Sequence, residues 1–523
     1  MTLLMGVPTI VIEAGGQALD ARQTAGLVEV LVRQTLSAPV LCELTFADPP
    51  GSLQVGDTLV PGTELRVTLA GDEVPLFEGE VTAVEHVYGA GHFRELRVRG
   101  YDRLHRLRKQ QSIRVMLRLT PLELAQEVAG AIGATVEAVA SGPPWERLVQ
   151  HRQSDLRLLL EVASRSGLYL VLRGSTLHLV TLEGIGEPVE LHWGTTLLEA
   201  RIETNGEPAT RSVEATGWDA TRVQSWRATA NEARVGRAVG AAVAPEQVGG
   251  SGVRVLVDEA VPDADRAAAL AQAELDARVA GEVTLSAVAR GDPRLRPATP
   301  IEIDNVHPQL SGRYVITEAI HRISRSEGYT TELSTAPPPL PERRYDTVAT
   351  PGIVTSVDDP EGLARVRVTL PSYGDIESAW MEVLSAGAGS GKGLIALPDI
   401  DDRVLVLMPH GDPAQGVILG GLYGAGGPPD TGVVGGAVRR YTLVTPGGHR
   451  IRLDDEGGLL TLEDASGGSV RLGQQRIRIE DVSGNSLDMS PQTVVLHSAV
   501  DVLIEAPGKG IVMRASSVDF ETG

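Results

Sequence analysis

The residues most suggestive of chemistry form a glycine-rich loop with a lysine, GAGSGKG, at residues 387–393. Such a loop can hold a phosphate group when a glycine stands five positions before the glycine that precedes the lysine, and Ser or Thr follows the lysine. Here Ala386 stands five positions before Gly391, and Gly393 follows Lys392. No helical pattern follows either, so we predict a flexible hairpin loop rather than a nucleotide site.

Neighbouring carboxylates occur at three places, Asp358/Asp359, Asp401/Asp402 and Asp454/Asp455. Catalysis by two carboxylates requires that both face one substrate. Successive residues of a strand point to opposite faces, and each pair lies at a turn-like position. We therefore predict solvated acids of turns rather than a catalytic pair.

The eleven histidines are scattered singly, without the His-Glu-x-x-His or His-x-His spacing of metal sites. His410 begins the turn-forming sequence HGDP, which separates two apolar runs at residues 404–408 and 417–419. This setting favours a turn-stabilising role over metal binding or general-base catalysis. There is no Gly-x-Ser-x-Gly sequence either, so the motifs predict no enzymatic activity, no metal and no cofactor.

Composition indicates a folded, soluble protein with several domains. Its 523 residues exceed the ~100–200 residues of one ordinary domain. The net charge of -21 disfavours general binding to nucleic acid or anionic membranes, and the single cysteine, Cys42, excludes an intrachain disulfide. The first residues resemble a strand rather than a signal peptide, and no apolar run reaches the ~18 residues of a membrane helix, so we expect synthesis in the cytoplasm.

One segment is locally basic, FRELRVRGYDRLHRLRKQQSIRVMLR, from Phe93 to Arg118. Aromatic residues that could stack on bases are only 3% of the chain. We interpret the segment as a solvated face or an internal subunit contact rather than as a nucleic-acid site.

Three helices interrupt a sequence that is otherwise dominated by short strands. The first is predicted from Thr120, which forms a capping box with Glu123, to Gly133. The second begins at Ser154 and precedes a hairpin at residues 169–180, and the third spans about 263–281.

Two linkers divide the chain into three regions. Residues 334–344 are rich in proline, and residues 424–432 are rich in glycine and proline. The expected regions are therefore 1–335, 345–425 and 437–523.

The last region contains an internal repeat. LLTLEDASGGSVRL at residues 459–472 lies 17 positions before RIRIEDVSGNSLDM at residues 476–489, which predicts stacked strand-turn units. We expect alternating strand to the end of the chain, with one apolar face per strand that a lone chain cannot cover. Three chains around one axis would cover it, and the expected core of this trimeric needle is Leu460, Leu462, Ile477, Ile479, Val494, Leu496, Val502 and Ile504.

Residues 352–424 carry a family resemblance. This stretch resembles the OB-fold domain of VgrG-type spikes and of contractile-phage baseplate proteins. The features that match, in the order of the family, are the DPEGLARVRV turn, the Trp after Ser-Ala, the glycine-rich loop, LPDIDDRVLV and HGDP…GxLYG. The residues that match this family pattern are Asp359, Pro360, Gly362, Trp380, Pro398, His410, Gly411, Asp412, Pro413, Gly421 and Tyr423.

The flanking regions resemble the same family. The N-terminal region resembles the hub of phage late-control D proteins, in the stretches GYDRLHRL, residues 153–180 and GDPRLRPATPIEI. The C-terminal region resembles the start of a trimeric β-helix, in the stretch GGHRIRLDDEGG. The resemblance implies a mainly β, multi-domain fold: β-barrel-like hub domains with a few helices at 1–335, an OB-fold collar at 345–425 and a trimeric β-helix or β-prism needle at 437–523. It also implies a homotrimer that binds an inner tube protein, baseplate proteins and a separate PAAR-like tip protein, with cargo effectors as further partners.

We therefore expect a non-enzymatic puncturing spike of a bacterial contractile injection system, assembled in the cytoplasm. The short needle favours a particle released outside the cell over a type VI secretion spike or a phage tail. Two other functions stay open. One is a spike with cell-wall hydrolase activity, although no lysozyme-like insert stands at residues 424–432, and the other is a glycan-binding β protein, although aromatic residues are few.

Overall fold

The computed structural model describes residues 8–47, 54–72, 74–219, 224–257, 261, 263–339, 346–424 and 426–521. The chain forms two compact units, Met1–Gly421 and Leu422–Gly523. Strands predominate in both, which confirms the predicted mainly β, multi-domain fold. Part of the expected proline-rich linker, residues 340–344, and the expected boundaries at 1, 345, 425 and 523 lie outside the described residues.

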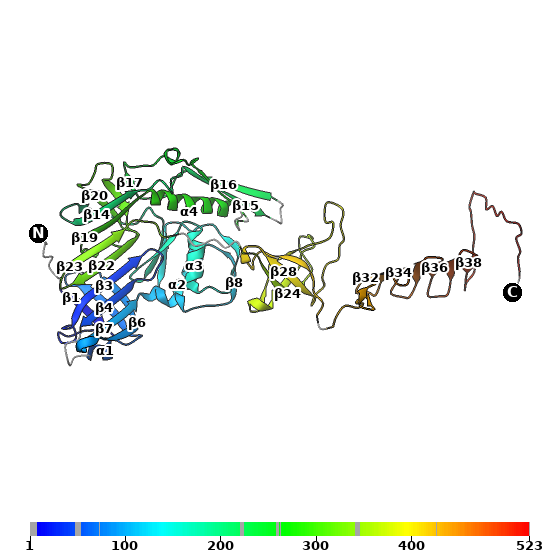
Figure 1. Ribbon diagram of the computed structural model, residues 1–523, viewed down its shortest axis with the longest axis horizontal. Helices are drawn as coiled ribbons and strands as arrows, with labels where there is room; N and C mark the ends of the chain where they lie inside the picture. Colours follow the sequence, from blue (N-terminus) through cyan, green and yellow to red (C-terminus); the bar gives the residue numbers. More distant parts are fainter. Residues whose placement is uncertain are drawn as a thin grey trace. The chain divides into compact units, whose positions relative to one another are not determined.

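A curled sheet of eleven strands organises the N-terminal region (Figure 1). Burial alternates along its strands, so that one face packs against two apolar cores and the other face is polar. The strand Leu27–Thr35, near the start of this region, pairs with the strand Glu318–Ser324, near its end, and so brings the two ends of the region together. In spatial order the strands are β14 (Leu197–Thr204), β19 (Val283–Arg290), β23 (Gly328–Ser334), β22 (Glu318–Ser324), β3 (Leu27–Thr35), β4 (Leu41–Ala47), β7 (Arg94–Tyr101), β6 (Phe77–Tyr88), β5 (Glu64–Leu69), β1 (Ile10–Ala14) and β2 (Gln17–Ala18).

The first two predicted helices are confirmed. In α2 (Pro121–Gly130), Thr120 and Glu123 form the expected capping box, and α3 (Asp155–Ser164) has Ser154 as its N-cap. Both helices bury apolar residues in one core. The strands of this part are β8 (Arg114–Leu119), β9 (Thr135–Ala138), β10 (Trp145–Gln150), β11 (Tyr169–Arg173) and β12 (Thr176–Val180), of which the last two form the predicted hairpin.

The third predicted helix is α4 (Ala264–Glu282), capped by Asp263. It packs against a three-stranded sheet of β15 (Ser212–Asp219), β16 (Gln224–Ala230) and β18 (Val253–Leu256). A further sheet contains β13 (Val189–His192), β17 (Ala238–Val239), β20 (Pro300–Asp304) and β21 (Gly312–Val315). The sequence did not predict the short helix α1 (Gln54–Thr58). In the described part of the chain, no helix is long and apolar enough to cross a membrane.

Residues 348–421 form a six-stranded sheet around their own core. The two apolar runs that flank HGDP become β28 (Arg403–Met408) and β29 (Val417–Gly421), which pair antiparallel. Val404, Val406 and Ile418 are fully buried in this core. The remaining strands are β24 (Val348–Ser356), β25 (Arg367–Leu370), β26 (Ile376–Glu377) and β27 (Glu382–Val383).

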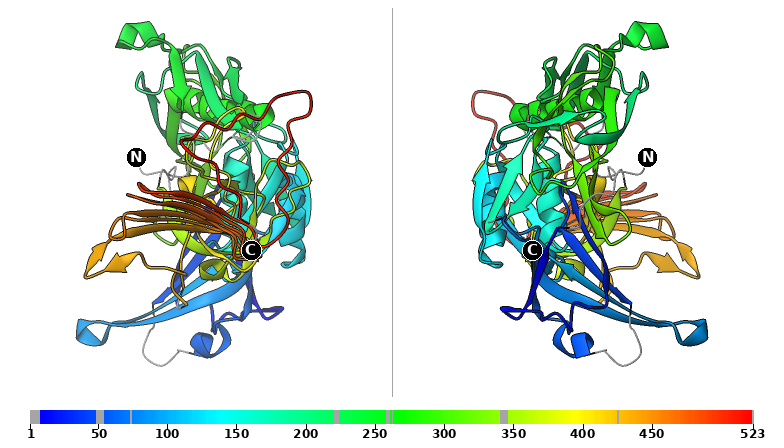
Figure 2. Two further views of the ribbon diagram at one scale, coloured as in Figure 1. Left: turned by 90° about the vertical axis from the view of Figure 1, so that its right-hand side faces the viewer. Right: turned by 90° about the vertical axis from the view of Figure 1, so that its left-hand side faces the viewer.

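The second unit contains a seven-stranded antiparallel meander, in which each strand pairs with the next. Figure 2 views it end-on, with the strands stacked one behind another. Its strands are β32 (Arg440–Val444), β33 (Arg450–Asp454), β34 (Leu459–Glu463), β35 (Ser469–Gly473), β36 (Ile477–Glu480), β37 (Ser486–Met489) and β38 (Val494–His497), preceded by a small hairpin of β30 (Val433–Val434) and β31 (Ala437–Val438).

The expectation of strand to the end of the chain is wrong for the single chain. Described residues after His497 contain neither helix nor strand. Pro507 lacks a backbone donor for a ladder, and Gly508 has a left-handed φ of 70° in a turn. Residues 499–506 contain neither proline nor glycine, and they too form no ladder with β38, the outer strand of the meander.

Candidate assembly surfaces

The strand register of the meander places every apolar row on one face. Cross-strand partners point to the same side of a sheet, so the pairing of Ile451 with Leu462, and of Leu462 with Val470, continues from strand to strand. We call the resulting surface the needle face. Its two rows are Leu443, Ile451, Leu462, Val470, Ile479, Leu487 and Leu496, and Tyr441, Leu453, Leu460, Leu472, Ile477, Met489 and Val494.

The opposite face of the meander is polar. Its central row is Thr442, Arg452, Thr461, Arg471, Arg478, Asp488 and Val495. Arg476 and Arg478 both pair with Asp488 there. One side of the sheet is thus built for water and the other is not.

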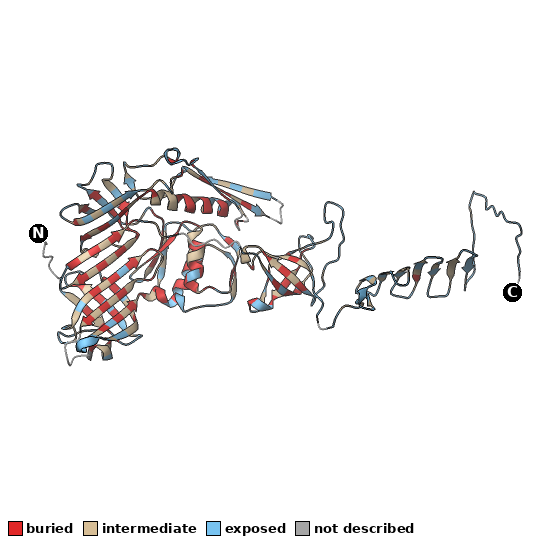
Figure 3. Cartoon of the chain, in the orientation of Figure 1, coloured by how far each residue is buried: buried red, intermediate tan, exposed pale blue. Residues whose placement is uncertain are grey.

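A single chain leaves the needle face exposed. Leu462 is 41% exposed and Leu496 is 64% exposed, and a hollow of about 490 Å³ lies over the row that contains Leu462. Figure 3 shows almost no buried residue in these strands, in contrast to the first unit. Contiguous apolar surface of this kind marks a site of association.

Six of the eight residues expected in the needle core lie on the needle face, and two do not. Val502 and Ile504 follow the last strand and are 55% and 63% exposed. The other members of the face were not predicted, although the same alternation marks their strands. Those members are Tyr441, Leu443, Ile451, Leu453, Val470, Leu472, Leu487 and Met489.

The predicted 17-residue repeat is confirmed as two equivalent hairpins, β34–β35 and β36–β37. Each turns on an aspartate: Asp464 accepts hydrogen bonds from three backbone N–H groups, and Asp481 from two. Hydrogen bonds from Ser466 and from Asn485, respectively, lower the pKa values of the two carboxyls. Gly467 and Gly484 have φ of 102° and 88°, which a side chain would disfavour.

The HGDP turn meets the hub through Asp412. Burial raises the pKa of this carboxyl, while the N–H of Ala414, at 2.9 Å, and the positive charges of Arg266 and Arg165 oppose the rise. Both guanidinium groups lie over the indole of Trp145, at 3.8 Å and 5.6 Å from the ring centroid. We call Asp412, Arg266, Arg165 and Trp145 the hub–OB joint.

Further contacts join the same two regions. The rings of His151 and Tyr373 lie 5.1 Å apart, and Arg152 lies over Tyr373 at 5.9 Å. Arg147 donates to the backbone carbonyl of Glu377. The OB domain is therefore attached to the hub by aromatic and charged contacts that the sequence did not predict.

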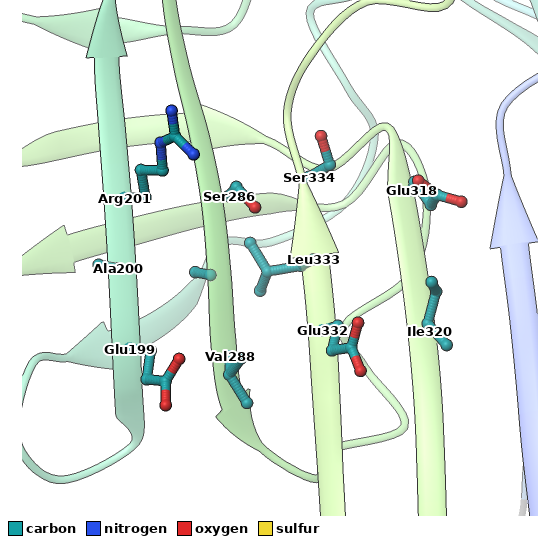
Figure 4. A pocket seen from close by; sticks show the side chains of 11 residues that line it. Glu199, Ala200, Arg201, Ser286, Val288, Glu318, Ile320, Glu332, Leu333 and Ser334 are labelled. Carbon is teal, nitrogen blue, oxygen red and sulfur yellow. The ribbon is translucent and has the colours of Figure 1, made fainter.

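A hollow of about 370 Å³ lies on the polar face of the large sheet (Figure 4). Ser286 and Ser334 are cross-strand partners there, but no histidine, cysteine or lysine is among the lining residues. Its glutamates Glu318 and Glu332 pair with arginines of the same sheet. A serine nucleophile requires an adjacent base, so the hollow is a charged surface rather than an assembled triad.

The other chemical candidates also adopt structural roles. The GAGSGKG loop is the predicted hairpin, closed by hydrogen bonds between the backbones of Gly389 and Lys392. His410 lies in a tight turn with φ of 54°. Among the described residues, no group of three or more His, Cys, Asp or Glu side chains could hold a metal ion.

The sequence of the hub region places the chain in a known family. Residues 33–327 match the model of the phage tail baseplate hub family. This chain belongs to that family. Residues 350–423 of this hub-family protein match the injector OB domain of type VI secretion systems and phage baseplates. No curated protein sequence matches the chain.

Three solved structures can be compared with this hub-family protein, one of them with a TM-score above 0.5. A chain of the lidded Francisella PdpA–VgrG complex aligns with a TM-score of 0.52 and 9% identity, covering 95% of this chain and 80% of that one. The 43 kDa tail protein of prophage MuSo2 from Shewanella oneidensis aligns with a TM-score of 0.49, 16% identity and coverage of 62% and 97%. The E. coli c3393 protein, a component of the type VI secretion system, aligns with a TM-score of 0.48, 13% identity and coverage of 79% and 99%.

One family-pattern residue of the hub protein contradicts the prediction of a solvated turn acid. The Asp359 side chain is only 2% exposed, because Arg365 folds back and donates two hydrogen bonds to it, at 2.9 and 2.7 Å. The backbone N–H groups of Glu361 and Leu363 also donate to it. The bonds from Arg365 are the main cause of its lowered pKa. Asp359 therefore holds the turn, in which Gly362 has φ of 66°.

The remaining family-pattern residues are distributed over the OB domain. Trp380 is half-buried beneath the guanidinium of Arg367, which lies 4.7 Å from its ring centroid. Tyr423, in contrast, is 73% exposed. The others lie in turns or strand ends: Pro360 and Pro398 in loops, Gly411 and Pro413 in the HGDP turn, and Gly421 at the end of β29.

The basic segment from Phe93 to Arg118 is compensated by neighbouring acids. Five of its arginines, on β7, β8 and the turn between them, pair with glutamates of other strands or helices. This pairing supports the interpretation as a solvated or internal surface. The pairs are Arg99–Glu43, Arg103–Glu78, Arg106–Glu80, Arg114–Glu127 and Arg118–Glu146.

A buried histidine makes hub stability depend on pH. His321 on β22 is fully buried, and its Nδ1 lies 3.0 Å from the hydroxyl of Tyr329 and 3.1 Å from that of Thr331. Burial lowers its pKa to about 3. Between the ordinary pKa of about 6.5 and pH 3, the unfolded chain binds a proton that the folded hub does not. As the pH is lowered through this window, the free energy of unfolding should therefore fall by about 1.4 kcal/mol per pH unit through His321 alone.

His321→Gln should reduce this pH dependence by about one proton. Thermal unfolding of the full chain between pH 7 and pH 4 measures the change in slope. His307→Gln, on an exposed loop, is the matched control and should leave the slope unchanged. Equal slopes in His321→Gln and the unsubstituted chain would contradict the prediction.

Proposed function

We propose that this hub-family chain is the central hub and spike of a bacterial contractile injection system and acts as a non-enzymatic homotrimer. The observation that carries the proposal is the needle face, an apolar surface two rows wide that the single chain leaves uncovered. Three such faces packed around one axis bury the rows and close the long exposed edges. A rigid prism of this kind can transmit force and pierce an envelope.

The proposed partners are those that the family resemblance implies. The hub binds the inner tube and baseplate proteins, and the far end of the needle carries a separate PAAR-like tip protein. Cargo effectors are further proposed partners, and one of the structures with a similar fold is a chain of the Francisella PdpA–VgrG complex. The paired basic segment and the net charge of -21 argue against nucleic acid.

The proposed place of assembly is the bacterial cytoplasm. From there the particle can be released to act outside the cell. A type VI secretion spike and a phage tail spike are the two alternative settings. Purification of the assembled particle from the medium, with this chain in it, would support the extracellular setting, and its retention in the cell would count against it.

We expect the purified full chain to leave peptidoglycan intact. In its first-unit hollow, no histidine is among the lining residues, and the carboxylates of Glu318 and Glu332 are paired with arginines. The two rows of the needle face contain no carboxylate. Zymography on a peptidoglycan gel tests this, with a known muramidase as the positive control. Clearing at the position of the purified chain would favour the cell-wall hydrolase instead.

A further inference from the structure

Two arginines that form no ion pair with a described carboxylate line a cavity in the hub. The cavity has a volume of about 110 Å³ and lies where β3, the β5–β6 loop, the β11–β12 hairpin and the loop before β20 meet. Arg173 comes from the end of β11 and Arg296 from the loop. Exposed Val74 and Gly174 stand at its rim, so small solutes can reach it. We call it the arginine cavity.

Backbone carbonyls fix both guanidinium groups without neutralising them. Nη2 of Arg173 donates to the carbonyl of Pro297 at 3.0 Å and to Thr299 Oγ1 at 3.2 Å. Arg296 donates to the carbonyls of Pro293 and Pro75, at 2.6 and 2.8 Å. Among the described residues, no carboxylate lies within ion-pair distance of either arginine.

The carboxyl groups of the cavity are already engaged elsewhere. Asp102, only 4% exposed, accepts hydrogen bonds from the N–H groups of Val40 and Leu104 at 3.0 and 3.1 Å. Glu78 accepts from Arg103 at 3.3 Å. Neither acid therefore compensates Arg173 or Arg296.

One of the lining arginines has a hydrogen-bond donor that is unused among the described atoms. Nε of Arg173 is buried and has no partner among the described atoms. A buried donor without an acceptor costs about 1–3 kcal/mol, and burial together with the charge of Arg296 lowers the pKa of Arg173. A purely structural role for the two arginines explains the bonds to carbonyls, but it leaves this donor of Arg173 without an acceptor among the described atoms. The charge of Arg296 is offset only from beyond ion-pair distance, by Asp72.

We propose that the arginine cavity binds one small tetrahedral oxyanion, phosphate or sulfate, between the guanidinium groups of Arg173 and Arg296. Planar guanidinium groups bind such oxygens through pairs of N–H donors. The cavity exceeds the ~30 Å³ share of a water molecule several-fold, which leaves room for a five-atom ion. The bound ion would tie the β11–β12 hairpin to the loop before β20 and stabilise the hub.

Thermal unfolding of the full chain in phosphate tests this, with ionic strength held constant by sodium chloride. The unfolding temperature should rise along a saturating curve by about 2–4 °C. Arg173→Lys keeps the charge but loses Nε, and it should weaken the apparent phosphate affinity at least tenfold. Arg294→Lys is the matched control, because Arg294 is 73% exposed and pairs with Asp292, and it should respond like the unsubstituted chain.

Anions also stabilise proteins without binding, so the difference between variants decides the question. An equal response in Arg173→Lys and the unsubstituted chain, or an equal effect of chloride, would overturn the proposal. If Arg173→Lys does not fold, crystals of the unsubstituted chain soaked in selenate provide a second measurement. An anomalous peak between Arg173 and Arg296 supports the site, and a cavity without one rejects it.

Discussion

Leu462→Asp is expected to abolish the trimeric needle while the hub stays folded. Leu462 lies in the middle of the needle face, paired with Ile451 on one side and Val470 on the other. In a trimer, the substitution places three carboxylates next to one axis. The rows of the needle face contain no arginine, lysine or histidine that could pair with them.

The expected effect is large because symmetry repeats every loss three times. Burying one leucine side chain contributes ~1.5–3 kcal/mol, and a carboxylate buried without a partner costs several kcal/mol more. In the proposed trimer, the stability of the needle resides in the association rather than in the single sheet. Sedimentation of the full chain should therefore change from a trimer to smaller species, and protease should cut the needle region while it spares the hub.

Thr461→Asp is the matched control. Thr461 is the preceding residue on β34, but it lies on the polar face between Arg452 and Arg471. A carboxylate there meets cations and water, so the trimer should persist. A trimer that survives in Leu462→Asp, or that dissociates equally in Thr461→Asp, would contradict the assembly of needle faces around one axis.

Local signals predicted the elements that depend on neighbours in the chain. Thr120, Pro121 and Glu123 specify a helix start within four positions, and the structure has that capping box. The repeat around Asp464 and Asp481 likewise predicted two hairpins, because each turn is held by its own aspartate. Such features need no information from distant residues.

Long-range strand pairing could not be predicted from local patterns. The order of the large sheet depends on contacts such as that of Val32 with His321, which no short stretch of sequence encodes. The hub–OB joint is similar, since Trp145, Arg266 and Asp412 come from three distant parts of the chain, and Arg266 is the residue that interacts with both of the others. The HGDP sequence indicated a turn, but it did not indicate that Asp412 of this turn interacts with arginines of the hub.

Some misses had a readable signal. Asp359 is followed six positions later by Arg365, and a short turn that brings such residues together predicts an ion pair rather than a solvated acid. The end of the needle strands at His497, in contrast, was not marked, because the alternation of apolar residues continues to Ile504. The exposed rows of the needle face follow from the alternation in every strand.

Trp145→Ala is expected to destabilise the hub by about 3–5 kcal/mol, the usual cost of deleting a buried tryptophan side chain. Trp145 is 7% exposed, and its ring packs in the core shared by α2 and α3. The substitution also removes the aromatic surface beneath Arg266 and Arg165, and each cation–π contact adds about 0.5–2 kcal/mol. Denaturant unfolding of the full chain measures the loss.

The consequence should extend from the hub to the OB domain. Without the indole, the guanidinium of Arg266, a residue only 8% exposed, loses the ring that orients it toward Asp412. Protease should then cut the described linker residues 335–339 sooner than in the unsubstituted chain. Trp145→Phe keeps a smaller ring and should retain part of the stability.

Trp193→Ala separates this effect from the loss of a tryptophan as such. Trp193 is 53% exposed and lies outside the joint, and surface substitutions of this kind usually change stability by less than ~0.5 kcal/mol. If Trp145→Ala were no more destabilising than Trp193→Ala, the stacked arginines would not depend on the indole. If it weakened the hub without faster cleavage before the OB domain, the joint would have to be held by the Tyr373 contacts instead.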